Sequence, residues 1–168
     1  MKLDKAEAQL HGRLEHGERV LVSTDGVPLV NTASLSAADL VGSGGAPPQR
    51  AGLGIGGAIV GRNDKMIRRD AVTGGEGAIA RSVPTEAKAF GLVLTDRRLA
   101  LYHRNVELEL QDAAWEIPRE RVVGVRKLAR TTLMRRLRVH FDDGSTVDIS
   151  MPPGKSMGVM REELGTAP

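Results

Sequence analysis

The chain has 168 residues, which suits a single domain, and no cysteine, which excludes disulfides, thiolate nucleophiles and Cys-ligated zinc. Its 24 Lys and Arg against 21 Asp and Glu give a formal net charge of +3, too small to indicate a nucleic-acid partner without a concentrated basic face. No secretory signal is visible, and the most apolar stretch, AGLGIGGAIVG at 51–61, is about half as long as a transmembrane helix. We therefore expect a cytoplasmic protein without a transmembrane segment.

The first thirty residues predict one helix and two short strands. Apolar residues three and four apart predict an amphipathic helix over residues 3–15, and Gly17 is expected to end it. A first strand is predicted at 18–23 and a second at 27–30, with a turn at Thr24-Asp25-Gly26 between them.

Residues 31–89 are interpreted as a long Gly/Ala-rich insertion within one domain that spans residues 1–168. Eleven of the 20 glycines fall in residues 42–77, and ordering a glycine costs more backbone entropy than ordering another residue. Much of the insertion is therefore expected to be loop, with a short helix at 36–40 and a short strand at 58–60. Loops of this length are usually functional or disordered.

From Phe90 onward the sequence alternates with a period of two and contains all four aromatic residues. It predicts strands at 90–94, 99–104, 115–117, 121–128, 133–141 and 146–151. Asp142-Asp143-Gly144-Ser145 is the clearest hairpin signal, because Gly after Asp readily adopts the positive φ of a tight turn. The alternation places Leu137, Val139, Phe141, Val147 and Ile149 on a buried face and Arg136, Arg138 and His140 on a wet face. Trp115 and Tyr102 are expected in the core, and a short helix over 156–164 is expected to end at Gly165.

Three segments resemble bacterial pleckstrin-homology-like (PH-like) domains of the GRAM type. They are LVLTDRRLALY at 92–102, WEIPRERVVGVRK at 115–127 and LRVHFDDGSTVDI at 137–149. The strand GERVLVS at 17–23 fits the same pattern. The resemblance implies a mainly β fold, a small barrel of two nearly orthogonal antiparallel sheets with a C-terminal helix that plugs one open end. This sequence departs from the pattern in its long insertion and in its short, glycine-interrupted closing helix.

The best functional candidate is a run of six cations: Arg126, Lys127, Arg130, Arg135, Arg136 and Arg138. Many pleckstrin-homology domains bind anionic phosphoinositide headgroups with basic residues near strand ends, so the resemblance implies an anion- or lipid-binding site here. Near an anionic membrane each cation contributes about 1 kcal/mol. The competing interpretation is an ordinary solvated face, because residues 116–150 hold eight Lys or Arg against five acids.

Other motifs are interpreted structurally. Thr95-Asp96-Arg97-Arg98 is expected to be the corner of a hairpin, with Thr95 and Asp96 closing the turn and both arginines facing solvent. The glycines of 52–57 follow Pro47-Pro48 and precede no Gly-Lys-Ser/Thr, which argues against a nucleotide-binding loop. The four histidines, His11, His16, His103 and His140, lack metal-ligand spacing, and Ser145 lacks a nucleophile elbow.

These observations favour a non-enzymatic binding or scaffold module, without cofactor or metal, that attaches peripherally to an anionic membrane surface. The alternative is a protein–protein interaction module that uses an unpaired sheet edge or the Gly-rich insertion. Nucleic acid is not expected as a partner, because the few aromatic residues supply no row of stacking faces. An enzyme is the least favoured class, since no partner base, acid or metal ligand accompanies Asp96.

Overall fold

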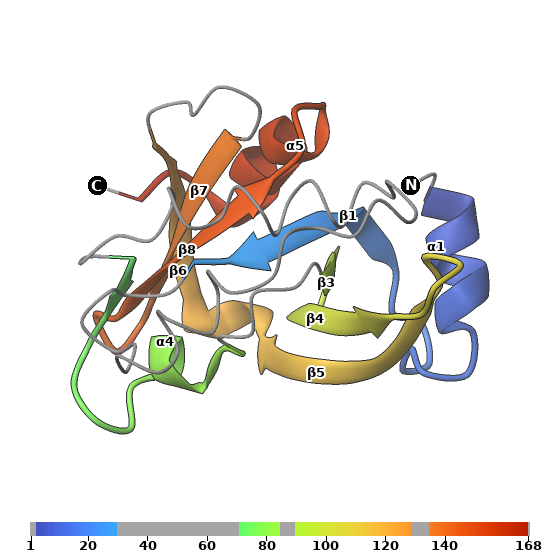
Figure 1. Ribbon diagram of the computed structural model, residues 1–168, viewed down its shortest axis with the longest axis horizontal. Coiled ribbons are helices and arrows are strands. Elements are labelled where there is room, and N and C mark those ends of the chain that lie inside the picture. The colour runs from blue at the N-terminus through green and yellow to red at the C-terminus, as the bar shows by residue number, and fades with distance from the viewer. Residues whose placement is uncertain (1–2, 30–70, 85–89, 129–134, 168) are drawn as a thin grey trace, which may run out of the picture.

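The computed structural model describes residues 3–29, 71–84, 90–128 and 135–167 (Figure 1). It contains the strands β1 (Val20–Pro28), β2 (Val72–Thr73), β3 (Phe90–Thr95), β4 (Arg98–Arg104), β5 (Leu110–Pro118), β6 (Val122–Lys127), β7 (Arg135–Phe141) and β8 (Thr146–Met151). The helices are α1 (Leu3–Leu10), α4 (Ile79–Ser82), the 3-10 helix η2 (Arg119–Arg121) and α5 (Ser156–Leu164). The helix expected at 36–40 and the strand expected at 58–60 lie outside the described residues. None of the described helices is both long and apolar enough to cross a membrane.

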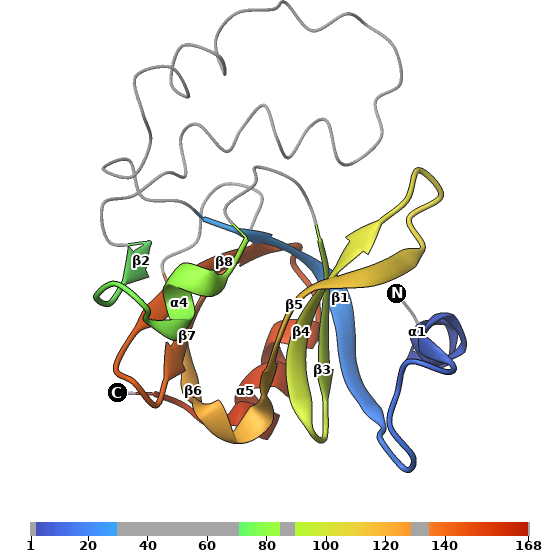
Figure 2. The same cartoon turned by 90° about the horizontal axis from the view of Figure 1, so that it is seen from below.

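The strands pair antiparallel in the order β5-β4-β3-β1-β8-β7-β6, with β2 also on β8. Figure 2 shows two halves of the sheet, β1 with β3 to β5 and β6 to β8, facing each other across the interior. The mainly β prediction is therefore confirmed. Within the described part of the chain no ladder joins the edge strands β5 and β6, so the sheet is not the closed barrel that was expected.

β1 is one long strand where the sequence predicts two strands and a turn. Residues 24–26 pair with residues 90–92 of β3, and Val27 and Pro28 pair with β8. Gly26 suits this crossing, because a Cβ atom there would approach Leu92 Cβ and Ile149 Cγ2 to 3.1 Å. The chain therefore passes from one half of the sheet to the other in extended conformation, and pairing with β3 overrides the turn signal.

β1 and β2 follow one another along the same edge of β8, like one strand interrupted by residues 30–70. The pairs are Val27 with Ser150, Pro28 with Ile149, Val72 with Val147 and Thr73 with Thr146. Between them the Asp148 carbonyl accepts the N–H of Leu29, and the Asp148 N–H donates to the carbonyl of Ala71, both at 2.8 Å. The interruption thus begins and ends opposite one residue, and β2 and α4 within the expected insertion belong to the fold.

The predicted hairpin at 142–145 is confirmed, and it also holds α4. Gly144 has a φ of 77°, and Ser145 donates its N–H and hydroxyl to Asp143 Oδ1 at 2.9 and 2.6 Å. Asp143 Oδ2 accepts the N–H of Ile79 at 2.8 Å, and Ser145 Oγ accepts the N–H of Ala80 at 3.1 Å. The turn therefore satisfies N–H groups that the first turn of a helix leaves without partners.

The main core lies between the two halves of the sheet and α5. The five residues predicted for the buried face of the hairpin are all buried: Leu137, Val139, Phe141, Val147 and Ile149. Trp115 is half-buried with its ring edge-on to Phe141, at a centroid distance of 6.1 Å, and it donates Nε1–H to Ser82 Oγ at 2.9 Å. Helix α5 forms as predicted and packs Met157, Met160 and Leu164 on this core.

A second, smaller core lies between α1 and the outer surface of the sheet. Ala6 and Leu10 of α1 pack with Val93 of β3 and Tyr102 of β4. The helix ends at Leu10, five residues before the predicted end, and Gly12 adopts a φ of 82° that right-handed helices exclude. Both faces of β3 are consequently buried.

Candidate functional site

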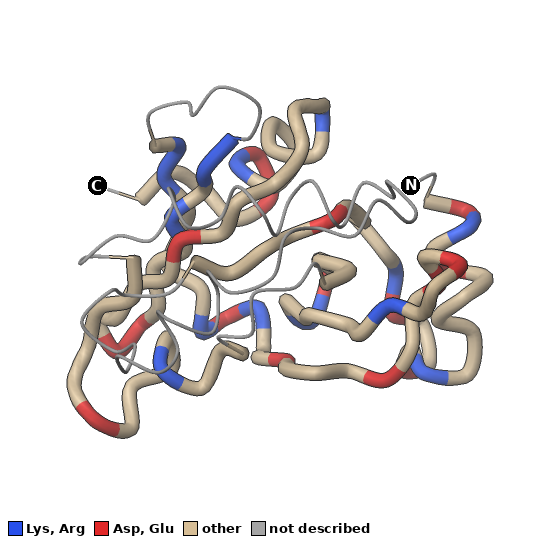
Figure 3. Tube along the Cα trace, viewed as in Figure 1, with Lys and Arg blue, Asp and Glu red and all other residues tan. Residues whose placement is uncertain are grey.

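The predicted cations gather where β6 ends and β7 begins. Arg126 lies directly opposite Arg138, and Lys127 lies opposite Leu137. Figure 3 shows the Lys and Arg segments of the two strands side by side near α5. Arg130, in the connection between these strands, lies outside the described residues.

Three of these cations are available to a ligand. Arg126 and Lys127 are exposed and Arg135 is half-exposed. In the described part of the chain, none of the three makes an ion pair or a side-chain hydrogen bond. Together with the partly exposed Arg138 they form what we call the basic surface.

The prediction that Arg136 and Arg138 lie on a solvent-facing side of the sheet is wrong. Arg136 is only 2% exposed and bonds the Asp148 carboxylate through Nη2. Arg138 bonds the same carboxylate, with Nε 2.7 Å from Oδ1 and Nη2 3.2 Å from Oδ2. Asp148 is fully buried on β8, directly opposite Arg138. A buried ion cluster therefore replaces the expected solvated row, and Arg136 is not accessible to a ligand.

The sequence around the basic surface contains no negative charge. All six predicted cations and no acid fall in residues 122–141. Like charges opposite each other on neighbouring strands destabilise a sheet, so Arg126 beside Arg138 gains from a bound anion. Burial lowers the pKa of His140, the positive charges of Arg138 and Arg126 lower it further, and Asp148 partly offsets them. The pKa of His140 therefore lies below its ordinary value, which favours the neutral imidazole.

The Thr95-Asp96-Arg97-Arg98 tetrad forms the turn between β3 and β4 and also holds the segment before β1. Thr95 Oγ1 accepts the N–H groups of Arg97 and Arg98 at 3.1 and 2.9 Å. Asp96 accepts the N–H of Arg19 at 3.0 Å, and this bond lowers the pKa of Asp96. Arg97 Nη1 lies 2.5 Å from Glu15 Oε2.

The prediction that Arg98 faces solvent is wrong. Its Nε and Nη2 bond the two oxygens of Glu18 at 2.9 Å each, and Nη1 bonds Glu116 at 2.8 Å. Burial raises the pKa of Glu18, but hydrogen bonds from the Thr95 hydroxyl, the Glu15 N–H and Arg98 outweigh it, so this pKa lies below its ordinary value. The tetrad therefore joins the hairpin to the chain before β1.

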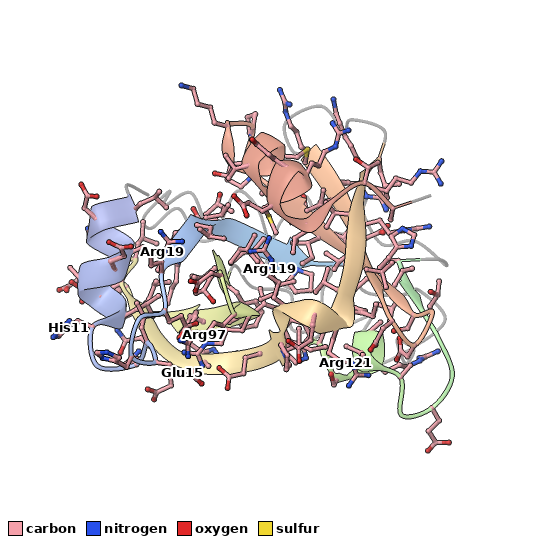
Figure 4. All side chains as sticks on the ribbon, turned by 180° about the vertical axis from the view of Figure 1, so that it is seen from behind. His11, Glu15, Arg19, Arg97, Arg119 and Arg121 are labelled. Atoms are coloured by element: carbon pink, nitrogen blue, oxygen red, sulfur yellow. The ribbon has the colours of Figure 1, made fainter. Side chains whose placement is uncertain are left out.

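An open hollow of about 820 Å³ lies beside this corner, bordered by the ends of β5 and α5 and by η2 (Figure 4). Three acids of its lining are paired with arginines of the lining, Glu15 with Arg97, Glu116 with Arg98 and Glu163 with Arg119, whereas Glu120 lines it without an ion pair among the described residues. The lining includes Asp96 but neither His103 nor His140. Across the described ranges, no three His, Asp or Glu side chains are placed to hold a metal ion. Most of the charge around the hollow is therefore neutralised within ion pairs.

No protein-family model matches this sequence, and no curated protein matches it.

Asp148 is the member of this region that the sequence interpretation missed. A two-residue turn at Asp143 and Gly144 would place Asp148 opposite Val139, whereas the observed register places it opposite Arg138. The partner of Arg138 therefore depends on a one-residue difference in the length of the turn, which the sequence does not specify.

Proposed function

We propose that this protein is a non-enzymatic binding module whose basic surface attaches it to an anionic membrane from the cytoplasmic side. The observation that carries the proposal is a group of cations without ion pairs to other described residues, Arg126, Lys127 and Arg135, in a stretch of sequence without acids. Exposed cations that have no ion-pair partner among the described residues present a positive potential to solvent. Such a potential attracts the negatively charged headgroups of a lipid leaflet.

The fold that we propose is a PH-like domain of the GRAM type. The resemblance implies two antiparallel sheets with a C-terminal helix at one open end. In support, β1 continues from one half of the sheet into the other, and α5 packs Met157, Met160 and Leu164 against the interior.

The expected attachment is weak and sensitive to salt. At about 1 kcal/mol per cation, Arg126, Lys127 and Arg135 together contribute about 3 kcal/mol, or about 150-fold in partitioning. Arg138 adds less because Asp148 shares its charge. Salt near 1 M shortens the screening length to about 3 Å and should release the protein.

Co-sedimentation with phosphatidylcholine vesicles, with and without phosphatidylserine, tests the proposal. Arg126→Glu should weaken binding to the anionic vesicles about 30-fold, because one attraction is lost and one repulsion of similar size is added. Lys5→Glu is the matched control, since Lys5 is exposed on α1 and the charge change is the same. Binding that ignores lipid charge, or equal losses in both variants, would contradict the proposal.

A protein–protein interaction through a sheet edge is the second candidate function. β5 is an edge strand that exposes Asp112, Ala113 and Glu116. Its outer backbone groups suit the addition of a strand from a partner. The β6 edge is less accessible, because Val125 donates its N–H to the carbonyl of Gly165 at 3.0 Å and accepts the N–H of Ala167 at 3.2 Å. Indifference to lipid charge in the vesicle experiment would leave this candidate in place.

A further inference from the structure

The connection between β4 and β5 holds two apolar side chains in water. Val106 is 100% exposed and Leu108 is 56% exposed. Figure 2 shows this hairpin projecting from the body of the protein on the side of α1. Neither side chain belongs to a core cluster of the described residues, so the fold does not require them to be apolar.

The backbone of this connection is fixed in a costly conformation. Leu108 has a φ of 62°, the one positive φ of a non-glycine residue in the described ranges. Such a conformation costs about 1–3 kcal/mol and is typical of binding sites. Asn105 closes the loop, because its Oδ1 accepts the N–H of Glu109 at 2.8 Å and its carbonyl accepts the N–H of Leu108 at 3.0 Å. The loop therefore presents Val106 and Leu108 at a cost that glycine at position 108 would avoid.

The charges of the loop indicate the kind of surface that it can bind. Glu107 is exposed between the two apolar side chains, and Glu109 follows them. A complementary surface carries an apolar side chain beside cations. β6 of this protein has both, because Val123 is 57% exposed and Arg126 and Lys127, which form no ion pair with another described residue, follow on the same strand.

We propose that the β4–β5 tip, residues 105–109, of one molecule docks on β6 of a second copy. Figures 1 and 2 place the tip and β6 at opposite ends of the molecule, so the contact joins unlike surfaces of two molecules. A contact between unlike surfaces repeats head to tail unless the rotation closes a ring. Few side chains take part, so the buried area falls below the roughly 1,200 Å² of stable interfaces, and the association is weak.

The same cations serve the proposed membrane attachment. Anionic lipid that occupies Arg126 and Lys127 therefore competes with the tip of a neighbouring molecule. Self-association is expected in salt-poor solution without lipid, and phosphatidylserine vesicles should reverse it.

Sedimentation velocity over a range of protein concentrations tests the inference. The tip variant carries Val106→Ser with Leu108→Gly, and the β6 variant carries Arg126→Glu with Lys127→Glu. Each variant alone should stay monomeric, whereas the wild type and the control Leu3→Ser, which removes an exposed apolar side chain of α1, should associate as concentration rises. A mixture of the two variants should form dimers and nothing larger, because each supplies the surface that the other lacks.

A wild type that stays monomeric, or a tip variant that still associates, would overturn the inference, as would a mixture that forms no dimer. Vesicle binding separates this inference from the proposed function. The tip variant should bind phosphatidylserine vesicles like the wild type, and the β6 variant should not. The tip variant should also melt no lower than the wild type, since glycine relieves the positive φ of residue 108, so loss of association would not reflect unfolding.

Discussion

Glu18→Gln is expected to destabilise the protein by about 3 kcal/mol, because the buried carboxylate has only donors around it. Oε1 accepts from the Thr95 hydroxyl and Arg98 Nε, and Oε2 accepts from the Glu15 N–H and Arg98 Nη2. A glutamine amide has one oxygen, so its NH₂ group must face an N–H of Arg98 whichever way it turns.

The size of the loss in stability depends on the partners that Arg98 keeps in the variant. Breaking a buried ion pair costs about 3–5 kcal/mol when the remaining charge is left without compensation. Arg98 keeps the Glu116 carboxylate and the Arg13 carbonyl, each at 2.8 Å, so the lower end of that range applies. For a domain of this size a loss of about 3 kcal/mol lowers Tm by about 6–12 °C.

Urea unfolding of Glu18→Gln and Glu15→Gln at neutral pH measures the effect. Glu15 pairs with Arg97 in the same segment but is 64% exposed, so its loss should cost at most about 1 kcal/mol. Equal losses in the two variants would refute the reasoning, because burial would then not determine what the pair contributes.

We also expect the contribution of Glu18 to the unfolding free energy to be lost in acid. The pKa of Glu18 is lower in the folded state than its ordinary value of 4.5, so its contribution to stability is fully present above that value and is lost as pH falls through the folded pKa. The difference in unfolding free energy between wild type and Glu18→Gln should therefore shrink on acidification below pH 4.5. A difference that stays constant would contradict the assignment.

Three further changes test the sheet and its surface. Arg126→Ala should raise the pKa of His140, because one nearby positive charge is removed, and an NMR titration of the imidazole that shows no rise would contradict this. Phe141→Ala should cost about 3–5 kcal/mol in urea unfolding and weaken the near-UV circular dichroism of Trp115, which loses its edge-on neighbour. Gly124→Val should displace the C-terminal tail, since a Cβ atom there would lie 2.9 Å from a tail backbone nitrogen. Faster amide exchange at 165–167 is the expected sign, and unchanged exchange would argue against it.

The hairpin from Arg135 to Met151 was predictable because local signals agree there. Alternation assigns Leu137, Val139 and Phe141 to one face, and Gly144 supplies the positive φ that the turn needs. In other parts of the chain, contacts between residues far apart in sequence determine the secondary structure. Residues 24–26 have the composition of a turn, yet pairing with β3 keeps them extended. β5 begins at Leu110 rather than at Trp115, because an edge strand tolerates polar residues that hide its alternation.

The candidate site was predicted in part for the same reason. Proximity in sequence located Arg126, Lys127 and Arg135 on adjoining strand ends. It could not show that Arg136 is buried, since the carboxylate that neutralises it belongs to a different strand. The strain at Leu108 was likewise hidden, because nothing in the residue type signals a positive φ.

The junction of Leu29 and Ala71 opposite Asp148 has a consequence for the evolution and engineering of this chain. Because Leu29 and Ala71 both hydrogen-bond to the backbone of the same residue, Asp148, a foreign segment whose own termini lie close together should fit between them without changing the register of β8. The entropy of closing such a loop grows only with the logarithm of its length, so even a whole foreign domain is tolerable there. We therefore expect the sheet to keep its shape when the segment between Leu29 and Ala71 is replaced.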